Sequence, residues 1–174
     1  MVTRSYTSRR ELEVFHFNFI VTILVPLVLI LLQVLVPHIW PATVIVDLPL
    51  IGVIFFAVAR RNPISGALTG AMIGLIEDAL TGKPIGINGM AKAVIGYAAS
   101  SIGLQVDVEN IVTRLLMAFG FSLIQSVLLY LINRLLLGLP GYKLLWVHEL
   151  IRAGLNTAVA IPLFVFLDRF KQRD

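Results

Sequence analysis

Two adjacent carboxylates, Glu77 and Asp78, are the residues of this sequence that most resemble an acid–base pair. Neighbouring residues on a helix point about 100° apart, so the two carboxyl groups do not converge on one substrate atom. Acids at the C-terminal end of a helix also oppose the helix dipole and gain most from a nearby cation. Candidate cations are Lys83, Lys92 and Arg152. The pair therefore indicates ion pairing more strongly than catalysis.

Other kinds of active site find no support in the sequence. The chain has no cysteine, which excludes disulfides, thiol chemistry and cysteine-based metal sites. Its histidines, His16, His38 and His148, belong to different segments, so a shared metal site is not expected. Neither a serine nucleophile motif nor a phosphate-binding P-loop is present. We therefore expect a protein that is not an enzyme and that holds no cofactor or metal.

Glycines at regular helical spacings point to close helix packing. Gly66, Gly70 and Gly74 recur every fourth residue before the two acids. In the next apolar segment, three glycines recur every seventh residue: Gly89, Gly96 and Gly103. In a membrane, small residues at such spacings let two helix backbones approach closely. We predict that these six glycines pack helices against one another.

The composition indicates that lipid is the solvent of this chain. Of its 174 residues, 58% are hydrophobic and 14% are charged, whereas soluble domains are roughly half apolar and a quarter charged. The net charge of +4 could suggest a nucleic-acid partner in a soluble protein. Here the basic residues lie singly or in short clusters between apolar runs, which is typical of membrane-surface charge. Nucleic acid is therefore not an expected partner.

The apolar runs predict one all-α integral membrane domain over residues 1–174 with six transmembrane helices. A spanning helix needs about 20 mainly apolar residues, with about 17 to 25 tolerated. The predicted spans are Phe17–Val36, Val44–Ala59, Ile64–Leu80, Ile85–Leu104, Ile111–Leu137 and Leu145–Leu167. The links between them are short, which leaves no room for a soluble domain.

The distribution of Lys and Arg predicts the orientation, because cytoplasmic loops carry an excess of both. With the N-terminus inside, the cytoplasmic segments hold Arg4, Arg9, Arg10, Arg60, Arg61, Arg114, Arg169, Lys171 and Arg173. The outer segments then hold only Lys83, Arg134 and Lys143. This asymmetry predicts that both termini are cytoplasmic, which an even number of spans satisfies.

With this topology, the ionisable residues in or beside the spans gather toward the outer face. They are Glu77, Asp78, Lys92, Glu149 and Arg152. Intramembrane charges either pair with one another or mark a functional site. Two interpretations follow: the charges pair and orient the helices, or they form an outward-facing polar pocket or a surface where a partner docks.

Further polar residues have simpler interpretations. Asp47 and Pro49 indicate the start of the second helix, with Asp as its cap and Pro in its first turn. Gln125 and Ser126 lie with other polar residues on one face of the fifth span, and Asn156 lies in the sixth. Polar residues of this kind are typical of interhelical contacts.

Several short motifs follow one another in a characteristic order. Asp47-Leu48-Pro49-Leu50 is followed by Arg60-Arg61-Asn62-Pro63. Then come Gly74-Leu75-Ile76-Glu77-Asp78 and Gly82-Lys83-Pro84-Ile85-Gly86-Ile87-Asn88. This order resembles the MreD family of bacterial rod shape-determining membrane proteins. The similarity is strongest over residues 47–97, and Asp78 matches the aspartate of the family pattern. Glu77 is an additional acid without a counterpart there.

The resemblance implies a non-catalytic scaffold of the cell-elongation (Rod) complex in the bacterial inner membrane. Its implied partner is the single-span protein MreC. The same complex contains the MreB filament, the glycosyltransferase RodA and a transpeptidase that work in peptidoglycan synthesis. The resemblance also implies a fold similar to the S components of energy-coupling-factor vitamin transporters. A vitamin-binding S component is therefore an alternative function, and a small exporter is a third.

Overall fold

The computed structural model describes residues 19–40, 44–106, 110–139 and 144–169, and this part of the chain folds into six α-helices. The helices are α1 (Phe19–Ile39), α2 (Leu48–Arg60), α3 (Pro63–Thr81), α4 (Ile87–Gly103), α5 (Ile111–Leu131) and α6 (Trp146–Asp168). A π-helical turn, η2 (Ile132–Leu136), continues α5. The basic residues before 19 and after 169, and Lys143, lie outside the described residues, as does the predicted first residue Phe17.

Each predicted span corresponds to one helix, and among the helix starts the largest difference is at α2. The predicted span begins at Val44, whereas the helix begins at Leu48. Asp47 accepts a hydrogen bond from the backbone N–H of Leu50, and Pro49 lies in the first turn, so the predicted cap is confirmed. The fifth span, predicted as one helix, widens into the π turn, where the N–H of Leu137 donates to the carbonyl of Ile132.

Residues with left-handed backbone conformations end two of the helices. Gly82 ends α3 with φ of 66°, a conformation that glycine adopts without a steric cost. Arg61 ends α2 with φ of 51°, which is unusual for a residue with a side chain. Asn62 then caps α3 by accepting from the backbone N–H of Ser65. The turn between α2 and α3 is therefore only two residues long.

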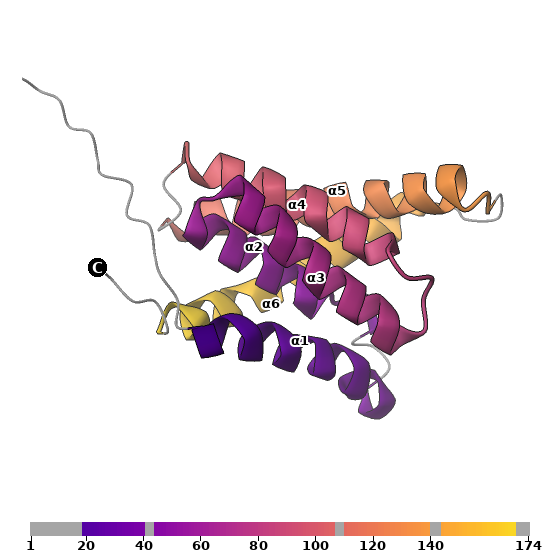
Figure 1. Cartoon of the computed structure of the whole chain (residues 1–174), viewed down its shortest axis with the longest axis horizontal. Coiled ribbons are helices and arrows are strands. Elements are labelled where there is room, and N and C mark those ends of the chain that lie inside the picture. Colours follow the sequence, from indigo (N-terminus) through magenta and orange to yellow (C-terminus); the bar gives the residue numbers. More distant parts are fainter. Residues whose placement is uncertain (1–18, 41–43, 107–109, 140–143, 170–174) are drawn as a thin grey trace, which may run out of the picture.

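The short helix α2 lies at the centre of the bundle and contacts each of the other five helices (Figure 1). All of its residues from Pro49 to Ala59 are buried. Phe55 and Phe56 pack edge to face, and Phe55 also packs against Phe164 of α6. A helix that is buried all round must be enclosed by other helices, and here the enclosing helices present the apolar surface of the protein.

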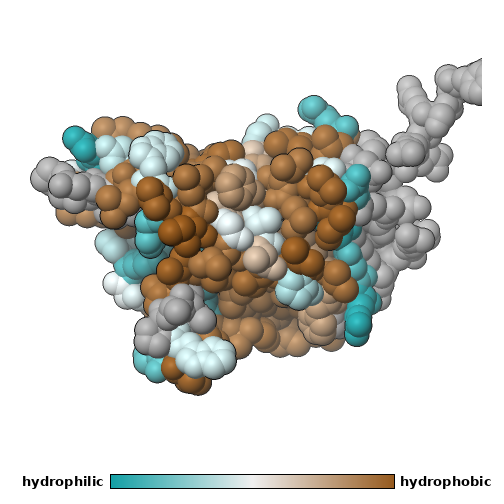
Figure 2. All heavy atoms as spheres, turned by 180° about the vertical axis from the view of Figure 1, so that it is seen from behind, coloured by the Kyte–Doolittle hydropathy of each residue, from teal (hydrophilic) through white to brown (hydrophobic). Residues whose placement is uncertain are grey.

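The outside of the bundle is apolar along its length. Exposed side chains include Leu24 and Leu35 of α1, Leu68 of α3, Leu116 of α5 and Val165 of α6. One face of the molecule is hydrophobic over most of its area, with hydrophilic residues mainly toward its ends (Figure 2). A soluble protein rarely exposes an apolar surface of this extent. The chain is a membrane protein on this evidence.

Four segments of the described chain are long and apolar enough to cross a membrane: Ile20–Ile39, Pro63–Thr81, Ile111–Leu136 and Trp146–Asp168. The central helix α2 has 13 residues and α4 has 17. Both are shorter than the usual spanning length. The described structure thus contains six helices, of which four meet the length and composition of a membrane span.

Helices α3 and α4 approach each other closely along the first glycine series. A Cβ added to Gly70 would overlap the carbonyl oxygen of Lys92, and one added to Gly74 would overlap that of Asn88. Gly66 and Gly96 face each other's backbones in the same way. Gly89 and Gly103 are less tight, with nearest atoms at 3.0 Å from Leu75 and 3.1 Å from Val58.

We expect Gly70→Ala to destabilise the protein, because the new methyl group would meet backbone atoms that cannot move independently of α4. Overpacking of this kind costs about 1–3 kcal/mol. The measurement is the free energy of unfolding of the purified chain in mixed detergent micelles. Gly154→Ala is the matched control, because a Cβ at Gly154 meets no atom within 4 Å. Equal stability of the two variants would contradict the close contact.

Candidate functional site: a buried polar cluster at the start of the central helix

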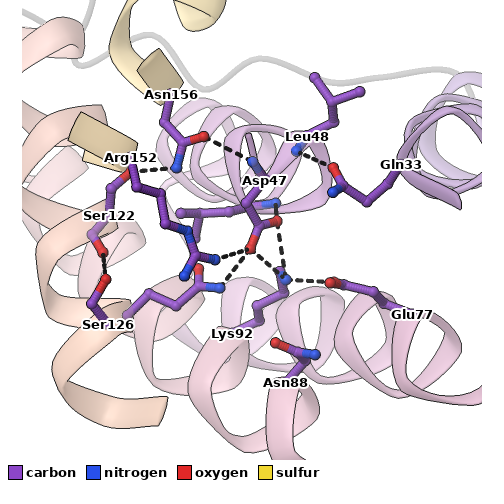
Figure 3. Close-up of polar contacts among 12 residues, drawn as sticks. Gln33, Asp47, Leu48, Glu77, Asn88, Lys92, Ser122, Ser126, Arg152 and Asn156 are labelled. Carbon is purple, nitrogen blue, oxygen red and sulfur yellow. Dashed lines mark hydrogen bonds and ion pairs between the residues drawn. The ribbon is translucent and has the colours of Figure 1, made fainter. Parts of the chain in front are cut away.

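The carboxylate of Asp47 is the centre of a buried polar cluster at the start of α2. Asp47 is 4% exposed. Its Oδ2 accepts hydrogen bonds from Lys92 Nζ at 3.2 Å, Gln125 Nε2 at 2.6 Å and Arg152 Nη2 at 3.2 Å (Figure 3). Its Oδ1 accepts from the N–H of Leu50 at 2.9 Å. One side chain therefore connects the central helix to α4, α5 and α6.

Side chains of two other helices satisfy the backbone at the same place. Asn156 of α6 accepts from the N–H of Asp47 at 2.8 Å, and Gln33 of α1 accepts from the N–H of Leu48 at 3.0 Å. The first N–H groups of a helix have no partner within it, and burying such a group without an acceptor is costly. At the start of α2, the neighbouring helices supply the acceptors.

Lys92 connects the cluster to α3. Its ammonium group lies between the carboxylates of Asp47 and Glu77 and forms an ion pair with each (Figure 3). Lys92 is 0% exposed. A buried charge is tolerated where it is paired and hydrogen-bonded, and two acids supply those partners here. Since the Lys92 carbonyl packs against Gly70, this ion pair depends on the close approach of α3 and α4.

A second branch of the cluster joins α5 to α6. Ser126 donates to Glu149 Oε2 at 2.5 Å, and Arg152 Nη1 lies 3.7 Å from the same oxygen. Asn156 donates to the hydroxyl of Ser122 at 3.0 Å. Arg152 thus bridges Asp47 and Glu149, and the polar face predicted for the fifth span meets the polar residues of the sixth.

Asp78 is separate from this cluster and caps the start of α4. It accepts from the N–H groups of Gly86 at 2.9 Å and Asn88 at 3.0 Å, and from the Asn88 side chain at 2.8 Å. No ion pair of the described residues involves Asp78. The positive end of the α4 dipole stabilises an anion at this position, so the expected cation is not needed. The two adjacent acids have different roles, which their different directions on the helix allow.

The structure therefore divides the five charged residues of the predicted cluster. Glu77, Lys92 and Arg152 meet around Asp47, and Glu149 joins through Arg152. The sequence interpretation missed Asp47 as the centre, treating it only as a helix cap. The signal that could have revealed it is a charged residue between two apolar runs, since such a residue needs partners.

The geometry favours ion pairs that orient helices over an open pocket. Lys92, Gln125 and Asn156 are at most 1% exposed. A solute could reach them only if helices moved apart. The arrangement can fix the relative positions of all six helices, because each helix contributes a hydrogen-bonding or ion-pairing group to the cluster. We infer no acid–base chemistry from it.

Replacing Lys92 by Met should leave two buried carboxylates with one remaining cation, Arg152. Breaking a buried ion pair on one side costs about 3–5 kcal/mol, so we expect a loss of this size in the free energy of unfolding in mixed micelles. Lys83→Met is the matched control, because Lys83 is exposed and its loss should change stability by less than about 0.5 kcal/mol. Similar stabilities would contradict the structural role of the cluster.

Comparison with known families gives one match, which covers almost the whole chain. The model of the rod shape-determining protein MreD matches residues 13–173. No curated protein and no solved structure matches the chain significantly. The matched region contains every motif on which the resemblance rested, together with the complete polar cluster. The chain therefore belongs to the MreD family of rod shape-determining membrane proteins.

Proposed function

We propose that this protein is a non-catalytic scaffold of the cell-elongation complex that pairs with MreC in the bacterial inner membrane. The observation that carries the proposal is the family match over residues 13–173. The buried cluster supports it, because its charged groups bind one another and stabilise one bundle. Such a protein would act by holding a fixed surface in the membrane and would turn over no substrate.

We further propose that all six helices cross the membrane and that both termini are cytoplasmic. A helix of 13 residues is about 20 Å long, which is less than the roughly 30 Å of the hydrocarbon core. Helix α2 can be short because the other helices enclose it, and its polar start is satisfied by side chains instead of water. The described arginines Arg60, Arg61 and Arg114 lie toward the end of the bundle away from Asp47, which agrees with a cytoplasmic face there.

The two other candidate functions receive less support. A fold like that of the S components remains part of our proposal. An S component needs an accessible ligand pocket, whereas the central charged groups of this cluster, Asp47, Lys92 and Glu77, are buried and paired with one another. An exporter would need an ionisable residue that can exchange protons during transport. Lys92 and Glu77 are instead enclosed as an ion pair.

Membrane topology can be tested with single cysteines, because the chain has none of its own. Lys83→Cys and Asn62→Cys place exposed thiols in the α3–α4 and α2–α3 turns. In intact spheroplasts, a membrane-impermeant maleimide should label position 83 and should label position 62 only after lysis. Labelling of both positions from the same side would rule out a complete crossing by α3 in this orientation.

The pairing itself is tested by co-purification. The tagged full chain, expressed together with MreC, should retain MreC in mild detergent. The apolar exterior supplies the docking surface in this proposal. An unrelated membrane protein with the same tag, expressed together with MreC, is the handling control and should not retain it. Absence of MreC from the wild-type sample, with MreC present in the same membranes, would overturn the proposed partnership.

A further inference from the structure

Arg61, in the turn between α2 and α3, has a guanidinium group of which two nitrogen atoms are buried without hydrogen-bond partners in the described chain. The residue is 7% exposed. Its Nε and Nη1 atoms are buried and have no hydrogen-bond partner there. An arginine stays charged under all physiological conditions, and an uncompensated buried charge is costly. This charge therefore needs an anion.

Two other arginines at this end of the bundle, Arg60 and Arg114, have partners for their guanidinium groups. The guanidinium of Arg60 donates to Thr22 Oγ1 at 2.7 Å and Ser65 Oγ at 3.4 Å, and it lies 5.9 Å from the centre of the Phe56 ring. Arg114 pairs with Asp168 at 2.5 Å. Arg61 differs from both, and it also holds the left-handed conformation with φ of 51°, which is strained for a residue with a Cβ.

The surroundings of Arg61 indicate the kind of anion. The turn leads directly into α3. Asn62 already caps the N–H of Ser65, but the positive end of the helix dipole still favours an anion nearby. From this end, the exposed residues Ile64, Leu68 and Met72 follow one another at every fourth position along α3. Together they form an apolar stripe that begins beside the charged turn. An acidic protein segment would match the charge but not the stripe, whereas a phospholipid matches both.

We propose that Arg61 binds the phosphate of an anionic phospholipid headgroup, whose acyl chain lies along Ile64, Leu68 and Met72. The planar guanidinium can donate two parallel hydrogen bonds to phosphate oxygens. Binding requires the side chain to turn toward the surface. The site depends on the bundle lying in a membrane but not on pairing with MreC.

The test measures lipid retention by native mass spectrometry of the purified full chain in detergent supplemented with phosphatidylglycerol or phosphatidylcholine. The wild-type chain should retain phosphatidylglycerol preferentially. Arg61→Gln should lower its retention by at least about fivefold, the effect of one basic residue at an anionic membrane surface. Arg60→Gln is the matched control: it removes the same charge from the preceding residue at the end of α2, where the guanidinium already has partners in the chain.

Several outcomes would overturn the proposal. Equal losses in the two variants would indicate diffuse attraction instead of a site at Arg61. Unchanged phosphatidylglycerol retention by Arg61→Gln would show that Arg61 does not bind this lipid. If Arg61→Gln lost a co-purifying acidic protein and kept the lipid, Arg61 would belong to a protein contact. Inorganic phosphate, if it stabilised the wild-type chain as much as phosphatidylglycerol, would show that the lipid itself is not selected.

A second variant covers the case in which Arg61→Gln does not fold. Arg61→Lys keeps the charge but loses the paired donors, so it should retain phosphatidylglycerol less well than the wild-type chain. Retention equal to that of the wild-type chain would contradict the proposal. MreC co-purification should be unchanged in either folded variant, which separates a failure of this site from a failure of the proposed function.

Discussion

The buried carboxylate of Asp47 is the constraint on which the rest of the structure depends. A central helix that is only 13 residues long begins inside the bundle, and its first N–H groups have no partners within the helix. Asp47 caps this helix and carries a negative charge into the same place. The charge requires cations, and the N–H groups require acceptors. The five surrounding helices meet these requirements by direct contact or through Lys92, so the start of α2 specifies how they are arranged.

The packing of α3 against α4 follows from the same requirement. Lys92 reaches Asp47 and Glu77 from α4, while its carbonyl lies against Gly70 of α3. In lipid, apolar side chains gain little by choosing a protein neighbour over an acyl chain, so close backbone contact and polar pairing must hold helices together. The glycine series provides the close contact, and the ion pairs provide the pairing. This leaves the apolar exterior free to face lipid or partner helices.

The six helices could be predicted from the sequence because long apolar runs separated by Pro, Gly and Asn carry a strong signal. The cap at Asp47 could also be predicted, because it joins residues only three positions apart. The cluster was only partly predictable. Glu77, Lys92 and Arg152 stood out as charges in apolar segments. Lys92 and Arg152, however, lie 45 and 105 positions from Asp47, and one sequence cannot pair residues so far apart. For Asp78 the sequence suggested a cation as partner, whereas the carboxylate accepts from backbone N–H groups at the start of α4. These contacts depend on the conformation of the intervening turn, which the sequence does not reveal.

A double-mutant cycle between Asp47 and Arg152 tests the central role of the Asp47 carboxylate most directly. The free energies of unfolding of Asp47→Asn, Arg152→Gln and the double variant would be compared with that of the wild-type chain in mixed micelles. Groups in one buried polar network show coupling energies of about 0.5–3 kcal/mol, whereas independent sites add within about 0.5 kcal/mol. We expect a favourable coupling of more than about 1 kcal/mol in magnitude, within the range for one network. Strict additivity of the two substitutions would contradict it.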